Sequence, residues 1–119
     1  MTLSITLQDR SLDFKLYTIG TLFSRIAGIY TFFIIPNQQP VGEPENQPTF
    51  KEEGFYNLLY LGITNNFNTR LKNHHKIAQA QQQGMNHIGI LKMRSGRKRK
   101  STERQLLKAY NPALNQTWL

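Results

Sequence analysis

The stretch AGIYTFFII, residues 27–35, is rich in β-branched and aromatic residues and stops at Pro36. A short apolar run that ends at a proline, which has no backbone N–H to donate to a neighbouring strand, is typical of a buried strand. A second run, FYNLLYLG at residues 55–62, has the same character. We expect the two runs to pair as an antiparallel hairpin, which would place Tyr30 and Tyr60 on the same side of the sheet.

Residues 64–83 follow the second strand and are expected to form one helix. Thr64 or Asn65 can cap its start, and Gly84 provides its stop. Arg70 and His74 stand four residues apart and would therefore share one face of this helix. Three apolar residues mark the inward stripe, namely Phe67, Leu71 and Ala78.

Two further elements complete the predicted core. The sequence IGIL at residues 88–91 indicates a third strand. A last helix is predicted to begin at Thr102, with Gln105 completing a capping box, and to end at the Asn-Pro pair of residues 111–112. The fold class predicted is therefore α+β, a small three-stranded antiparallel sheet flanked by helices.

The remaining segments lie around this core. Residues 1–24 show a short-period apolar pattern closer to a strand or hairpin than to a helix, and we interpret them as an N-terminal extension. The predicted domain covers residues 25–117 and includes an inserted proline-rich loop at 37–55. At 119 residues the chain is large enough for one domain of this kind.

Positive charge is concentrated in the second half of the chain. The net charge is +8, and residues 70–108 contain eleven Lys/Arg and a single carboxylate, Glu103. Such asymmetry is typical of nucleic-acid binding, because cations that neutralise phosphates release condensed counterions. The run RSGRKRK at residues 94–100 is predicted to be a phosphate-contacting loop. The expected contacts to nucleic acid are Lys72, Lys76, Arg94, Arg97, Lys98, Arg99 and Lys100.

Several classes of protein are disfavoured by composition. The chain has no cysteine, which removes disulfides and cysteine-based zinc sites. Its longest apolar run is about half of what a membrane-spanning helix needs, and the N-terminus lacks the layout of a secretory signal. We therefore expect an intracellular, cytoplasmic protein that does not bind membranes.

Two tripeptides in the predicted strands resemble the signature of a known family. Gly28-Ile29-Tyr30 and Tyr60-Leu61-Gly62 are similar to the paired motifs of the GIY-YIG endonucleases, with Leu in place of Ile in the second. Further family features follow in the same order along the chain. They are Arg70 ten residues after the second tyrosine, His74 one turn later, Glu103 early in a helix, and Asn115 near the end.

The resemblance implies a metal-dependent DNA endonuclease that hydrolyses a phosphodiester to 5′-phosphate and 3′-hydroxyl ends. Tyr30 would orient or deprotonate the attacking water, and Tyr60 would support it. Arg70 would stabilise the transition state, and His74 would assist by hydrogen bonding. Asn115 would shape the site.

The same resemblance implies a single metal ion, Mg²⁺ or Mn²⁺, with Glu103 as its ligand. The residues agree with this, because beyond Glu53 the chain offers Glu103 as its only carboxylate. Mg²⁺ accepts one carboxylate together with waters and substrate phosphate oxygens, so a single Glu is chemically sufficient.

Other interpretations stay open at the level of sequence. The insert between the two tyrosines is longer than the family's usual connection, and its carboxylates could cover the cationic site in place of DNA. The scaffold could serve a non-catalytic nucleic-acid-binding module, or a nuclease acting on single-stranded DNA or RNA. Cleavage of both strands of duplex or branched DNA would require a homodimer or two sequential nicks.

Overall fold

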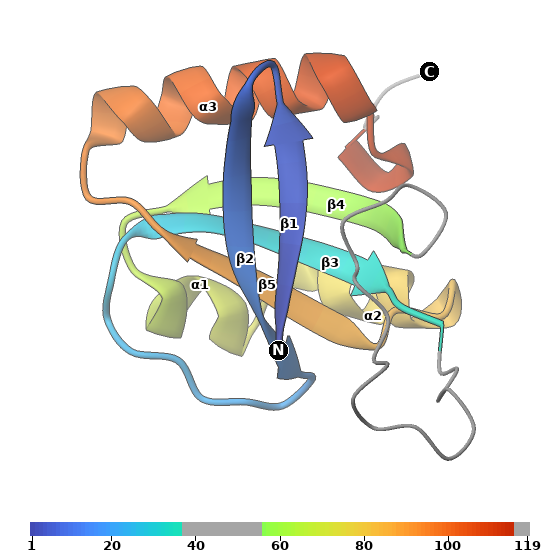
Figure 1. The fold of residues 1–119 in the computed structure, drawn as a ribbon. Coiled ribbons are helices and arrows are strands. Elements are labelled where there is room, and N and C mark those ends of the chain that lie inside the picture. The colour runs from blue at the N-terminus through green and yellow to red at the C-terminus, as the bar shows by residue number, and fades with distance from the viewer. Residues whose placement is uncertain (37–55, 116–119) are drawn as a thin grey trace.

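A computed structural model describes residues 1–36 and 56–115, which form an antiparallel sheet with helices on both of its faces (Figure 1). The strand order is β1-β2-β5-β3-β4. The strands are β1 (Thr2–Leu7), β2 (Arg10–Thr18), β3 (Gly28–Ile34), β4 (Asn57–Thr64) and β5 (His87–Lys92). The helices are α1 (Phe67–Lys72), α2 (His75–Gln82) and α3 (Gly96–Tyr110), followed by the 3₁₀ turn η2 (Ala113–Asn115). The chain is thus α+β, and the predicted insert at 37–55 lies outside the described residues.

The three strands expected from the sequence are confirmed, and β3 is the central one. It pairs antiparallel with β4 on one side and with β5 on the other. A bulge shifts the β3–β4 register between Phe32 and Phe33, where Leu59 is the extra residue. The bulge places Leu59 and Tyr60 against the same apolar cluster, although neighbouring residues of a regular strand point to opposite faces.

The prediction of a three-stranded sheet is wrong, because residues 1–24 contribute two further strands. The β1–β2 hairpin joins the sheet through pairing of β2 with β5, for example Lys15 with Ile90. This pairing satisfies the backbone groups along what would otherwise be an exposed edge of β5. The hairpin also buries one side of its alternating pattern, namely Leu3, Ile5, Leu7, Leu12, Phe14 and Leu16.

The sheet has a separate apolar cluster on each face. One cluster contains the buried residues of the hairpin together with Ile29, Phe33 and Leu106 of α3. The other contains Tyr30 and Phe32 with residues of α1, α2 and η2. Helix α3 therefore covers one face of the sheet, along β4, and α1 and α2 cover the other (Figure 1).

The single helix expected over residues 64–83 is two helices that meet at Asn73 and His74. Asn66, rather than Thr64 or Asn65, caps α1 by accepting a hydrogen bond from the Thr69 amide at 3.2 Å. His74 caps α2 in an extended conformation. The break changes the phase of the second half, so Ala78 is exposed and Ala80 is the buried alanine. The predicted stop at Gly84 is compatible with its φ of 103°, a backbone conformation that favours glycine.

The last helix begins earlier than predicted. Ser95 caps it by accepting from the Lys98 amide at 3.2 Å, so residues 96–100 of the basic run begin α3 and do not form a loop. Lys and Arg are good helix formers, and their charges are compatible with a solvated helix surface. Thr102 lies buried within the helix and cannot cap it. The predicted end is confirmed at Asn111, which has a left-handed conformation.

No helix in the described part of the chain is both long and apolar enough to cross a bilayer.

Candidate active site

Two other residues of the predicted site contact the hydroxyl of Tyr30. His74 Nε2 lies 2.8 Å from the Tyr30 oxygen, and Arg70 Nε donates to the same oxygen at 3.2 Å. These contacts join β3, the last turn of α1 and the cap of α2. Arg70 and His74 therefore do converge, but the helix break brings them together rather than one continuous helix face.

The proton of His74 is assigned by its second hydrogen bond. The Lys76 amide donates to His74 Nδ1 at 3.0 Å, so this nitrogen carries no proton. Burial, together with the charges of Arg70, His75 and Lys76, lowers the pKa of His74 to about 4, so the ring is neutral at pH 7. In the neutral ring the proton must then be on Nε2, which donates it to the Tyr30 oxygen.

Tyr60 stands beside Tyr30 on the same face, as the sequence predicts. The two ring centroids are 6.1 Å apart, and the Tyr60 ring also contacts His74. Tyr60 is half-buried, whereas Tyr30 is 1% exposed. Of the two phenols, Tyr60 is therefore the one that a ligand can reach directly.

The two signature glycines are required by the packing of this site. Tyr30 is the cross-strand partner of Gly62, and a Cβ at Gly62 would overlap the Tyr30 ring and hydroxyl. At Gly28 a Cβ would overlap the Leu91 carbonyl oxygen and the Phe67 ring. Glycine at both positions thus allows Tyr30 to lie flat over β4 and α1 to pack close to β3.

The ionisation of Tyr30 is set mainly by burial. Burial raises the pKa of Tyr30 well above its usual range, and the neighbouring Tyr60 raises it further through charge and a hydrogen bond. Arg70 lowers it, but burial outweighs this effect. Tyr30 is therefore held neutral, with its oxygen accepting from His74 and Arg70 and its own proton available to Tyr60.

Phe32 is a part of the site that sequence reasoning missed. Its ring stacks on Tyr60 with centroids 5.3 Å apart and meets His74 at 5.1 Å. The signal was present, because residues two apart on a strand share a face and Phe32 follows Tyr30 by two. The aromatic ring of Phe32 completes the wall that excludes water from His74.

Asn115 holds the edge of β4 next to Tyr60. Its side-chain oxygen accepts from the Leu61 amide at 2.8 Å, and its side-chain nitrogen donates to the Leu61 carbonyl at 2.8 Å. The asparagine thus replaces a missing strand at this point of the sheet edge. It contributes to the position of β4 and has no contact with the Tyr30 hydroxyl among the described residues.

Glu103 belongs to a different element and is not in the Tyr30 cluster. It lies half-buried on α3, which packs against the other face of the sheet and contacts β4. Within the described residues its carboxylate has no hydrogen bond or salt bridge to a partner. Burial raises the pKa of Glu103, and the nearby Arg104 lowers it.

The predicted phosphate contacts form two groups. Lys72 ends α1 and Lys76 lies in the first turn of α2, beside Arg70 and His74. The second group precedes and begins α3, and most of its side chains are exposed. Arg99 differs, because its Nη1 donates to the carbonyls of Met93 at 3.0 Å and Arg94 at 2.7 Å and so closes the β5–α3 connection.

Metal binding would have to rely on few protein ligands. In residues 1–36 and 56–115, no group of three or more His, Cys, Asp or Glu side chains is placed to hold a metal ion. Glu103 fits the remaining possibility, because a half-buried carboxylate that makes no salt bridge within the described residues can offer oxygen atoms to a hydrated Mg²⁺ ion.

The neutral His74 predicts a loss of stability in mild acid. Its pKa is 6.5 when unperturbed and about 4 in the folded protein, so the unfolded chain takes up the proton first. The stability due to neutral His74 is therefore complete above pH 6.5 and is lost as the pH falls towards 4, by up to about 3 kcal/mol.

Urea unfolding at pH 7 and at pH 4.5 measures this effect. His74→Asn keeps a capping side chain without a titrating ring, so we expect a smaller drop in unfolding free energy between the two pH values than in the wild type. His75→Asn, at the exposed neighbouring histidine, is the control and should keep most of the wild-type drop, because the burial that mainly lowers the pKa of His74 remains. Equal drops in all three proteins would contradict the assignment to His74.

Comparisons with protein-family models, with curated proteins and with solved structures found no match to this chain.

Proposed function

We propose that this protein is a metal-dependent DNA endonuclease of the GIY-YIG type, which hydrolyses phosphodiesters to 5′-phosphate and 3′-hydroxyl ends. The observation that carries the proposal is the convergence of Arg70 and His74 on the Tyr30 hydroxyl, directly beside Tyr60. The similarity of the two signature tripeptides supports it independently.

Arg70 is suited to bind the scissile phosphate. Tyr30 occupies only its Nε, and no described residue accepts from its two terminal amino groups. These groups are exposed with the side chain and can form a pair of parallel hydrogen bonds to phosphate oxygens. Because the guanidinium is held in place before the substrate arrives, it can stabilise the charge that develops on the oxygens in the transition state.

Tyr30 and His74 form the buried support of this arginine. His74 holds the Tyr30 oxygen through its Nε2 proton, and the oxygen in turn fixes Arg70. In the metal-free protein Tyr30 is neutral, so its first role is orientation rather than removal of a proton. The half-buried Tyr60 is then the phenol that can hydrogen bond to the attacking water or to the phosphate.

Glu103 is the residue proposed to hold the metal, Mg²⁺ or Mn²⁺. When bound, such an ion polarises a phosphoryl oxygen and lowers the pKa of a coordinated water. The Tyr60 side chain lies on the face of the sheet that α1 and α2 cover, whereas Glu103 lies on α3, which covers the opposite face and contacts β4, the edge strand that carries Tyr60. We place the scissile linkage at this edge, where Asn115 holds β4 in position.

The test is nicking of supercoiled plasmid with and without Mg²⁺, followed by a panel of duplex, branched and single-stranded DNA and RNA. We expect Mg²⁺-dependent relaxation of plasmid and products that a DNA ligase can reseal, because sealing requires 5′-phosphate and 3′-hydroxyl ends. Unchanged plasmid at every metal concentration would reject a DNA endonuclease. Cleavage of RNA or of single-stranded DNA alone would change the proposed substrate but would not contradict the proposed site.

A non-catalytic nucleic-acid-binding module is the second candidate. The observation that favours it is the near-complete burial of Tyr30, whose hydroxyl is already saturated by Arg70 and His74. The same experiment separates the two, because this candidate binds duplex DNA in a salt-dependent manner and produces no nicks with either Mg²⁺ or Mn²⁺.

A further inference from the structure

A groove lined by both polar and apolar atoms lies between the turn of the β1–β2 hairpin and α3, away from the Tyr30 cluster. It consists of two adjoining hollows, with volumes of about 280 Å³ and 440 Å³, that share Gln8 and Gln105. We call it the hairpin groove. The side chains in its lining that can bind an anion include Gln8, Arg10, Lys98, Ser101, Gln105 and Lys108.

The groove is positively charged. Arg10, Lys98 and Lys108 are exposed cations, and no carboxylate is among the described residues that line the two hollows. Asp9, the turn residue between Gln8 and Arg10, does not line either hollow. Amide and hydroxyl groups between the cations can donate hydrogen bonds to phosphate oxygens, which are the groups that most protein contacts to a nucleic-acid backbone use.

The α3 side of the groove is a straight stripe. Lys98, Ser101, Gln105 and Lys108 succeed each other at intervals of three or four residues and so lie along one side of the helix. Ten residues of helix span roughly 15 Å. A DNA strand carries one phosphate per about 3.4 Å of duplex axis, so about four phosphates of one strand match this length.

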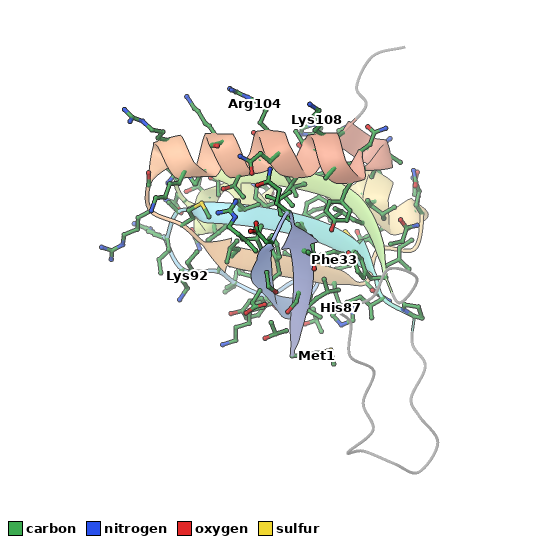
Figure 2. All side chains as sticks on the ribbon, turned by 45° about the horizontal axis from the view of Figure 1, so that its top comes forward. Met1, Phe33, His87, Lys92, Arg104 and Lys108 are labelled. Carbon is green, nitrogen blue, oxygen red and sulfur yellow. The ribbon has the colours of Figure 1, made fainter. Side chains whose placement is uncertain are left out.

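The stripe and Glu103 are on different flanks of α3. With 3.6 residues per turn, Glu103 lies roughly opposite the line that joins Lys98 and Gln105. Arg104, which lies between these flanks, and Lys108, at the edge of the stripe, point away from the sheet (Figure 2). A duplex lying across the outer side of α3 therefore meets cations continuously from the groove to the flank of Glu103.

We propose that the hairpin groove binds the phosphate backbone of duplex DNA as a second contact, separate from the candidate active site. This inference deepens the proposed function, since it takes DNA as the ligand. It also gives the β1–β2 hairpin a role beyond packing, because the hairpin supplies one wall of the groove and Arg10.

The test compares two triple variants with the same change in net charge. The groove variant carries Arg10→Gln, Lys98→Gln and Lys108→Gln. The control carries Lys15→Gln, Arg25→Gln and Lys92→Gln, which are exposed cations outside the groove lining. Binding of a fluorescent 20-base-pair duplex is measured by anisotropy over a series of salt concentrations without divalent metal, and thermal unfolding verifies that both variants are folded.

We expect the slope of log affinity against log salt to become shallower by about 2 to 3 in the groove variant, at about 0.9 for each lost phosphate contact. The control should keep a slope within about one of the wild type. Equal slopes in the two variants would overturn the proposal. So would competition by inorganic phosphate at constant ionic strength, since the groove would then bind free phosphate rather than a backbone.

The outcome separates this proposal from the nuclease proposal. A shallower salt slope in the groove variant, together with no plasmid nicking by the wild type, would support the groove proposal and reject the endonuclease proposal. Mg²⁺-dependent nicking with an unchanged slope would keep the endonuclease and reject the groove.

Discussion

Glu103→Gln is expected to reduce Mg²⁺-dependent plasmid nicking by about three orders of magnitude while duplex binding without metal is retained. The amide keeps the size of the side chain but has no charge with which to hold a divalent cation. Loss of the metal removes several kcal/mol of transition-state stabilisation, and each 1.4 kcal/mol corresponds to a tenfold change in rate. Initial nicking rates under excess enzyme measure the effect.

Glu103→Gln should not lower the folding stability, although it lowers the nicking rate. Burial raises the pKa of Glu103, so the folded state disfavours the ionised form that predominates at pH 7. Gln cannot ionise, and we expect the variant to be as stable as the wild type or more stable. Asp13→Asn, which removes a carboxylate from an exposed position of β2, is the control and should leave nicking unchanged. Wild-type nicking by the Glu103 variant would refute the metal assignment.

Arg70→Lys is expected to lower the single-turnover cleavage rate by at least about a hundredfold with little loss of DNA affinity. Lysine retains the positive charge, but one ammonium group cannot both reach the Tyr30 hydroxyl and form two parallel bonds to phosphate. Removal of a single preorganised donor from a transition-state site costs about a hundredfold to a thousandfold in rate. The cleavage rate and the DNA affinity are measured separately, because an arginine that acted only through its charge would leave both nearly unchanged when lysine replaces it.

Arg25→Lys provides the matched control, since it makes the same exchange at an exposed arginine outside the site. It should cleave at the wild-type rate. If Arg70→Lys also retained the rate within a few-fold, the guanidinium would have no special role and Tyr30 would be holding it for structural reasons alone.

The local elements of this protein are largely contained in short stretches of its sequence. The strands β3, β4 and β5 and the end of α3 at Asn111 were predictable, because an apolar run, its breakers and a helix cap involve residues close together in the chain. The position of Tyr30 and Tyr60 on the same face of the sheet followed from the antiparallel order of two such strands.

Local rules failed where two local interpretations were both reasonable. The charge of the basic run at 94–100 favours a loop, yet a capped helix accommodates the same charges on its surface. The break at His74 was hidden because residues 64–83 have no proline and no internal glycine. Its cause is the side chain of His74, which caps α2 and binds Tyr30 at the same time.

Local patterns in the sequence were enough to predict β3, β4, β5 and the end of α3 and to select the residues of the proposed site. Only the tertiary structure decided that the first 18 residues complete a five-stranded sheet, that Tyr30 is buried and neutral, and that Glu103 stands on the opposite face from the tyrosines. The physical reason is distance along the chain. Tyr30 meets Arg70 and His74 across 40 and 44 residues, and burial at such contacts depends on packing that no local pattern encodes.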